Sequence, residues 1–356
     1  MPAPRYPQSL MPHPMQKKRK KFRGLSLVHT TTLLAGFLIG VGFFSLPVLV
    51  GVDLALEAKA PPKPNFTITV DPERQVIIED PAIEALLVEE PETLSASVGL
   101  AREAFYALGA YVSNLPVYSL VAGVSGNETK VVVIYPGSRK EEVAAAFGSV
   151  LGWTKKQQLA FLANAKSKPP VLEEGQFQPG TYTVTKLTTP DQVQTMLYER
   201  FSTNIVERYS EETAKRVSLY DALTIASLLE REAGGWHDMR DISGILWNRM
   251  WGDMNLQLDA SLQYAKADTQ TGAKGVWWPK VVPKDKYIKS AYNTYANAGL
   301  PPGPISNPSI AAVVAALNPK KTDCMFYFHD DNGTFHCSAT YKEHVASLKK
   351  IYGRGK

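Results

Sequence analysis

The sequence contains little cysteine: Cys324 and Cys337 are the only two in 356 residues. They flank the segment MFYFHDDNGTFH, whose two alternating runs around an Asn-Gly pair predict a β-hairpin. If residues 329 and 334 pair across the turn, the cysteines lie diagonally on one face, where a disulfide can form; an oxidising compartment would suit it. The alternative, a zinc site that adds His329 and His336, lacks the tight Cys-x-x-Cys spacing of most such sites. We therefore favour the disulfide and expect no metal and no cofactor.

Positive charge is scarce outside the first 24 residues. Residues 1–24 hold seven Lys and Arg side chains and no acid, so the net charge of +5 for the whole chain leaves −2 for the rest. A nucleic-acid partner would need a basic face on the folded part, and no segment stands out as one. We expect no nucleic-acid binding.

Charged side chains are also missing from residues 25–52, LSLVHTTTLLAGFLIGVGFFSLPVLVGV, where His29 is the only ionisable group. About 20 apolar residues suffice to cross a bilayer, and basic residues before such a span keep that end in the cytoplasm. The segment predicts a single transmembrane helix, with 1–24 as a cytoplasmic tail and residues from 53 onward in the periplasm or another extracytoplasmic space. A cleaved signal peptide is a weaker alternative, because the only small-residue pattern precedes Pro61. A buried core helix is weaker too, because it rarely follows a block such as KKRKK.

Residues 53–129 are predicted to form a stalk, two strands and a helical insert. The stalk EAKAPPKPN is rich in proline and lysine, and the alternation in FTITVD and QVIIED predicts strands. Residues 80–125 are predicted to form an amphipathic helix pair. A second membrane span is disfavoured there, because Arg102 and Glu103 would need partners in hydrocarbon.

Residues 130–215 are predicted to form a small α+β subdomain. Its order is a strand in KVVVIYPGS, two helices, a return strand in GQFQPGTYTV, and a third helix opening at TTPD. The first four elements resemble a LysM-type glycan-binding module. The alternative is a subdomain that only supports its neighbour.

Residues 216–356 are predicted to begin with a deeply buried helix. A capping box at Ser218 starts it and Gly234-Gly235 ends it. Its last turns place Glu230 and Glu232 about 200° apart on the helix. A frayed, solvated helix end would explain both carboxyls. However, the partial negative charge of a helix C-terminus raises the pKa of a carboxyl there, which suits a proton donor.

Four motifs follow one another in this region: ASLLEREAG, LQLDASLQYA, SAYNTYANAGLPPGPISNPSIAAVVAALNP and YFHDDNGTFHCSATYKEHVA. Together they resemble the endolytic murein transglycosylases, also called the YceG-like or MltG family. The resemblance extends over roughly residues 130–350, and the predicted anchor with an outward domain is similar as well. It implies an α+β protein whose catalytic domain is 216–356 and whose partners are peptidoglycan glycan strands, with peptidoglycan synthases at the membrane.

By position, the resemblance assigns the family's catalytic glutamate to Glu232 and leaves Glu230 as a structural or supporting residue. It also assigns a set of polar positions that line or support the cleft: Gln257, Asp259, Tyr292, Asn293, Thr294 and Tyr295. Trp277 and Trp278 would either stack on sugar faces or, as is more common for such pairs, pack against protein.

The implied reaction is that of a lytic transglycosylase, which cleaves the β-1,4 bond from N-acetylmuramic acid to N-acetylglucosamine and leaves 1,6-anhydromuramic ends. Two alternatives remain open. One is a muramidase-type hydrolase of the same bond with Asp259 as base or nucleophile. The other is a non-catalytic peptidoglycan-binding scaffold.

Overall fold

The computed structural model describes residues 27–57, 63–83, 96–123, 129–271 and 275–353. The chain divides into two compact units, residues 1–43 and residues 44–356. Helix α1, Leu27–Glu57, begins in the first, and the predicted basic tail lies outside the described residues. Within the described ranges, no helix combines the length and the apolar character needed to cross a membrane. The span predicted at 25–52 stays a prediction.

The segment after the stalk contains less strand than its alternation predicts. Strand β1, Val70–Asp71, pairs antiparallel with β2, Val76–Ile77, and each strand has only two residues. The backbone before β1 bonds elsewhere, since the N–H of Phe66 donates to the carbonyl of Arg208 at 2.8 Å. The run FTITVD thus connects to a distant loop instead of lengthening the ladder.

A helix pair occupies the described part of residues 80–125, as predicted. Helix α3 is Ala96–Ser113 and helix α4 is Pro116–Gly123; residues 84–95 and 124–125 lie outside the described residues. The end of α3 packs on the next strand, where the Ser113 hydroxyl accepts the N–H of Val131 at 3.1 Å.

The predicted α+β subdomain has the expected order of strand, helix, helix, strand and helix. Its elements are β3, Thr129–Ile134; α5, Lys140–Leu151; α6, Lys155–Ser167; β4, Gly180–Thr185; and α7, Pro190–Asn204. The two strands pair antiparallel, with Val132 opposite Tyr182. The sheet and helices enclose an apolar core that includes Phe147, Phe161 and Phe177. Glycan binding by this LysM-like unit stays a prediction.

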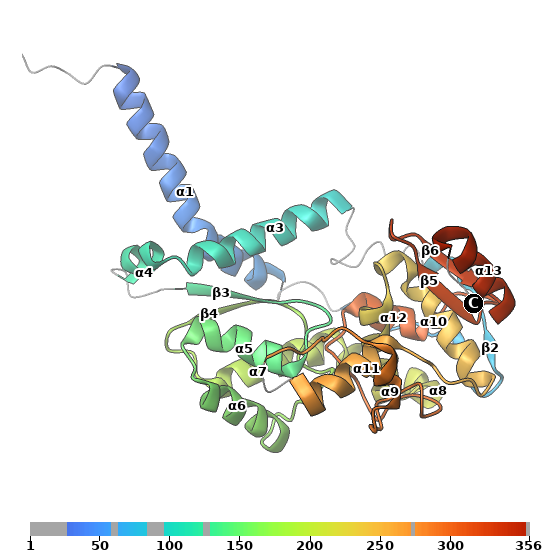
Figure 1. Cartoon of the computed structure of the whole chain (residues 1–356). Coiled ribbons are helices and arrows are strands. Elements are labelled where there is room, and N and C mark those ends of the chain that lie inside the picture. The colour runs from blue at the N-terminus through green and yellow to red at the C-terminus, as the bar shows by residue number, and fades with distance from the viewer. Residues whose placement is uncertain (1–26, 58–62, 84–95, 124–128, 272–274, 354–356) are drawn as a thin grey trace, which may run out of the picture. The chain divides into compact units, whose positions relative to one another are not determined.

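The rest of the chain is mainly helical, with one hairpin near its end (Figure 1). The elements are η1, Val206–Arg208; α8, Glu211–Arg216; α9, Leu219–Glu232; α10, Trp236–Trp251; α11, Asp259–Lys266; η2, Ala267–Thr271; η4, Pro283–Tyr287; α12, Ile310–Leu317; β5, Phe326–His329; β6, Phe335–Ser338; and α13, Tyr341–Tyr352. Every residue of α12 is buried, and this helix packs against α9 and α10. The described chain is therefore α+β, with its larger core around α9 and α12.

Helix α9 begins at the predicted cap and ends just before the two glycines. The Ser218 hydroxyl accepts the N–H of Asp221 at 3.0 Å, which caps the first turn. At the other end neither glycine lies in the left-handed region, and the cap residue is Ala233 in an extended conformation. Both glycine N–H groups donate to the carboxylate of Asp238 in the first turn of α10. The glycines therefore form a tight link between two helices instead of a left-handed cap.

The predicted hairpin is present with a different register. His329 pairs with Phe335, one residue from the predicted partner. The reason is Asp330, whose carboxylate accepts the N–H groups of Asn332 and Thr334 and closes a longer loop than a two-residue Asn-Gly turn.

A disulfide joins Cys324 and Cys337, whose Cα atoms lie 5.8 Å apart. The zinc alternative is wrong, because both cysteines are consumed and the two histidines have carboxylate partners, Asp238 for His329 and Asp330 for His336.

Candidate active site

Glu230 and Glu232 leave helix α9 on different sides, in agreement with their spacing. Glu230 Oε2 accepts the backbone N–H of Ser309 at 2.9 Å and the Ser309 hydroxyl at 2.7 Å. Ser309 is the N-cap of α12. Glu230 therefore ties the end of α9 to the start of the buried helix, which is a framework role.

Glu232 contacts α11 and the hairpin instead. Its Oε1 accepts the N–H of Ala260 at 3.0 Å, in the first turn of α11, and its Oε2 accepts the hydroxyl of Tyr327 at 2.9 Å on β5. The side chain is partly buried, with some surface left. A frayed, solvated helix end does not describe a carboxyl that is held at both oxygens by two distant segments.

Burial raises the pKa of the Glu232 carboxyl above its ordinary value. The hydrogen bonds from Ala260 and Tyr327 stabilise the ionised form and lower the pKa, but by less than burial raises it. The negative charge of Asp259 raises the pKa further. Sequence reasoning attributed the raised pKa to the C-terminus of α9. In the structure, removal from water is the main cause of the raised pKa. The N–H of Ala260 brings the positive end of α11 to the carboxyl, so the helix end that contacts Glu232 lowers its pKa. Glu232 therefore keeps its proton to a higher pH than an exposed glutamate, as a general acid must.

Asp259 and Tyr295 form a second polar pair beside Glu232. The Tyr295 hydroxyl donates to Asp259 Oδ1 at 2.7 Å, and Lys286 Nζ lies 4.6 Å from the centre of the Tyr295 ring. Asp259 is exposed and Tyr295 is partly exposed. These two residues bring a carboxylate and a phenol to the surface next to the partly buried Glu232 carboxyl.

Gln257 is also exposed, and its backbone is strained. Its φ of 53° lies in the left-handed region, which residues other than glycine seldom occupy. The Gln257 N–H donates to the carbonyl of Thr294 at 3.0 Å, so the loop after α10 is bonded to the YNTY segment. This bond holds Gln257 one residue before the buried Leu258 and two residues before Asp259.

Asn293 and Thr294 support the loop and do not line its surface, which is the second of the two roles that the family motif implies for them. Both are buried: the Asn293 amide donates to the carbonyls of Lys286 and Ile288 at 2.9 Å, and the Thr294 hydroxyl accepts the N–H of Leu258 at 2.9 Å. Buried backbone groups need such partners, so both residues support the loop and leave no polar group for a sugar.

Tyr292 also faces protein, because its ring packs against Tyr264 with the ring centres 4.7 Å apart. Of the YNTY motif, Tyr295 is the residue whose polar end reaches Asp259.

Two residues of this site escaped the sequence analysis. Tyr327 donates to Glu232, and buried Arg249 on α10 holds the hairpin by donating from Nε to the carbonyl of Met325 at 2.7 Å. The positive charge of Arg249 also lowers the pKa of Glu232. The alternation of the hairpin indicates that Tyr327 and His329 share a face, but no local pattern says which helix that face meets.

The paired tryptophans pack against protein. The Arg231 guanidinium lies 3.9 Å from the ring centre of Trp278, whose indole N–H donates to Glu142 at 3.0 Å. Arg139 lies 5.0 Å from the ring centre of Trp277. The two tryptophans thus connect the start of α5 to the end of α9, and each ring stacks on an arginine. The packing interpretation therefore holds for both rings.

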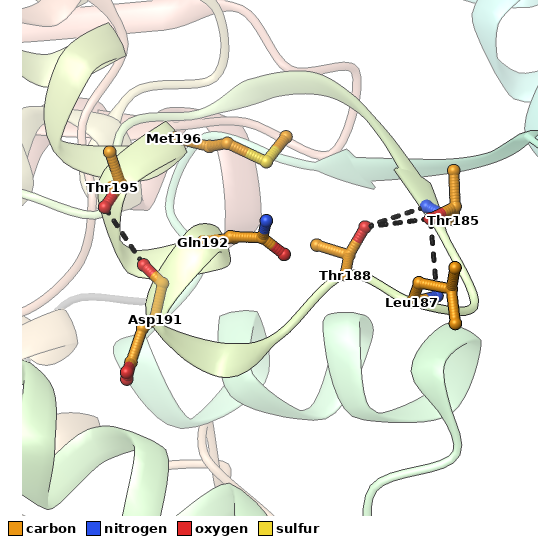
Figure 2. A pocket seen from close by; sticks show the side chains of 7 residues that line it. All are labelled: Thr185, Leu187, Thr188, Asp191, Gln192, Thr195 and Met196. Atoms are coloured by element: carbon orange, nitrogen blue, oxygen red, sulfur yellow. Dashed lines mark hydrogen bonds between the residues drawn. The ribbon is translucent and has the colours of Figure 1, made fainter.

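One cavity lies on the Glu230 side of α9. It has a volume of about 620 Å³, is lined by residues of α3, β3, β4, α7, α9, α10 and α12, and includes Glu230, Trp236 and Arg200 but not Glu232. A second cavity of about 500 Å³ is lined only by residues between 185 and 196, at the turn from β4 into α7 (Figure 2). Three threonine hydroxyls contribute to its wall beside Leu187 and Met196, and the N–H of Thr185 donates to the Thr188 hydroxyl there at 2.9 Å.

Comparisons with known proteins agree with one another. The model of the YceG-like family matches residues 73–350. A Bacillus subtilis (strain 168) protein named endolytic murein transglycosylase is 31% identical over 258 residues, which cover 66% of this chain and 68% of that protein. A Streptococcus pneumoniae (serotype 2, strain D39) protein with the same name is 30% identical over 190 residues, and the chain spans 34% of its length.

Among solved structures, the chain is similar to a putative yceG-like protein from Listeria monocytogenes, determined by crystallography. The TM-score is 0.53 and the sequence identity 29%, over 61% of this chain and 75% of that one.

Proposed function

The chain belongs to the YceG-like family, and from that premise we propose that it is an endolytic lytic transglycosylase of peptidoglycan with Glu232 as its catalytic acid and base. The named relatives in Bacillus and Streptococcus support the reaction class. The observation that carries the assignment of the acid is the setting of Glu232, whose carboxyl is held at both oxygens and whose pKa is raised by burial.

The proposed reaction needs one carboxyl because the substrate supplies the nucleophile. Glu232 donates its proton to the oxygen that links C1 of N-acetylmuramic acid to C4 of N-acetylglucosamine, and the bond from C1 to that oxygen breaks. The C6 hydroxyl of the same muramic residue then attacks C1, and its proton passes to the Glu232 carboxylate. The acid is regenerated, no water is consumed, and the glycan ends in a 1,6-anhydromuramic residue.

The hydrogen bonds at Glu232 suit both halves of this cycle. In the first half, burial favours the protonated carboxyl. In the second, the N–H of Ala260 and the hydroxyl of Tyr327 stabilise the carboxylate that remains. Gln257 and the pair of Asp259 with Tyr295 are the exposed groups from which sugar contacts would come.

The proposal includes a membrane anchor at residues 25–52, with the preceding basic tail in the cytoplasm and the catalytic part in the periplasm or another extracytoplasmic space. The support is the uncharged run itself and the seven basic side chains before it. An anchored enzyme would meet nascent strands where peptidoglycan synthases release them, so it would act in ending strand elongation.

The exposed carboxylate of Asp259 beside Glu232 keeps the muramidase alternative open to test. Full-length protein in detergent is incubated with purified sacculi, and the soluble products are analysed by mass spectrometry. A transglycosylase gives anhydromuramic ends. A hydrolase gives reducing ends heavier by one water, about 18 Da. The absence of any product would favour the scaffold alternative.

A further inference from the structure

Helices α3 and α4 carry an uncharged stretch with exposed apolar side chains. From Ala104 to Gly123 no side chain is charged. Four large residues of this stretch are exposed: Leu108 at 44%, Tyr111 at 63%, Val117 at 48% and Leu120 at 75%. Within each helix the two residues lie three positions apart, so they share one face. Large apolar side chains gathered on a surface indicate contact with another apolar phase.

The same helices lie along the outer end of α1. Three contacts occur in order: Arg102 with Asp53, Gly109 with Val50, and Tyr118 with Phe44. The first is an ion pair at 3.1 Å, supported by the Tyr106 hydroxyl, which donates to the same carboxylate at 2.6 Å. The second is so close that a Cβ added at Gly109 would lie 2.7 Å from Val50 Cγ2. The third joins the two aromatic rings with centres 6.4 Å apart.

These contacts indicate how deep in a bilayer α3 and α4 would lie if residues 25–52 form the anchor. Phe44 precedes the end of the 25–52 segment by eight residues, or about 12 Å of helix. One leaflet of hydrocarbon is about 15 Å thick. If the segment spans a bilayer, Tyr118 on α4 lies within the outer leaflet, whereas Arg102 lies level with Asp53, just beyond it.

We propose that the α3–α4 pair inserts into the outer leaflet beside α1, with Leu108, Tyr111, Val117 and Leu120 against lipid acyl chains. The inference rests on the proposed membrane anchor and goes beyond it, because it assigns a second lipid contact. Of the two charges that argued against membrane insertion of this region, Arg102 has its partner in Asp53 and Glu103 is exposed beside it, both at the level of the headgroups. Helical backbone is the form that hydrocarbon tolerates, because its polar groups are bonded internally.

Depth-dependent fluorescence quenching tests the proposal with the full-length protein. Leu120→Cys is labelled with an environment-sensitive fluorophore without reductant, so that Cys324 and Cys337 stay paired. The protein is reconstituted into vesicles of phosphatidylethanolamine and phosphatidylglycerol, with or without doxyl-labelled phosphatidylcholine. Val48→Cys, half exposed within the proposed span, is the positive control, and Leu187→Cys, 87% exposed after β4, is the negative control.

We expect a blue shift and loss of most of the fluorescence at positions 48 and 120 in doxyl vesicles, and neither at 187. Quenching at 48 without quenching at 120 overturns the proposal and leaves the anchor intact. No quenching at 48 removes the anchor and the proposal together, while product analysis on sacculi still decides the enzymatic activity. Because the vesicles contain no other protein, a surface made for a partner's helix gives no quenching at 120 and also overturns the proposal.

Discussion

The hydroxyl of Tyr327 donates to Oε2 of Glu232 at 2.9 Å, across 95 positions of sequence. This bond joins the disulfide-closed hairpin to the end of helix α9. It places the side chain of a strand in contact with the carboxyl that the proposed reaction protonates and deprotonates. Removing this bond is therefore expected to raise the pKa of Glu232.

The variant Tyr327→Phe should lower kcat about tenfold and move the alkaline limb of the pH profile to higher pH. The hydroxyl stabilises the ionised carboxyl, so its loss raises the pKa of Glu232 further, and one hydrogen bond to a charged group is worth about 1.5–3 kcal/mol. An acid catalyst is active below its pKa and loses activity as the pH rises through it. The measurement is kcat against pH. Tyr341→Phe, which removes an exposed hydroxyl from α13, is the matched control, and a profile identical to the wild type for Tyr327→Phe would refute the assignment.

Asp259→Asn should move the alkaline limb of the pH profile to lower pH. The negative charge of Asp259 raises the pKa of Glu232, so the neutral amide lowers it and activity is lost at lower pH. Most activity at acidic pH should remain, because substrate-assisted attack needs no second carboxylate. A loss of about a hundredfold or more at every pH would identify Asp259 as a base and favour the hydrolase.

Glu230→Ala should destabilise the fold. The substitution leaves two donors of Ser309 without their acceptor, and an unsatisfied buried group costs about 1–3 kcal/mol. Urea unfolding measures the change. A double-mutant cycle with Ser309→Ala isolates the bond to the hydroxyl. Equal unfolding free energies for Glu230→Ala and the wild type would show that Glu230 has no framework role.

Removal of the disulfide should weaken the hairpin and the site together. Cys324 and Cys337 are separated by 13 positions in the sequence, and for a loop of that length chain entropy gives about 3 kcal/mol. Cys337 lies opposite Tyr327 in the hairpin, so the double variant C324S/C337S should also lose part of its activity. The checks are the urea midpoint and the rate on sacculi under non-reducing conditions. The account is wrong on this point if both values match those of the wild type.

Local sequence signals predicted the elements that depend on local interactions. Ser218 and the apolar stripe of α9 are such a case, because a cap and a helix period involve residues three or four positions apart. The spacing of Glu230 and Glu232 also sufficed to predict that they face different ways.

Contacts between distant segments were beyond sequence reasoning. Asn293 was placed among positions that line or support the cleft, and only the structure shows that its amide bonds two carbonyls of the segment before it. Tyr327 was missed because its partner is 95 residues away. The two glycines were expected to end α9, but no local pattern indicates that Asp238 of the next helix accepts both of their N–H groups.

The most direct test of the central claim compares Glu232→Gln with Glu230→Gln in the release of anhydromuropeptides from sacculi. Both substitutions replace a carboxyl with an amide on the same helix end, and the circular dichroism spectrum shows whether each variant is folded. The account predicts that folded Glu232→Gln releases no anhydro product above background, while Glu230→Gln retains activity. Wild-type release by Glu232→Gln would contradict it.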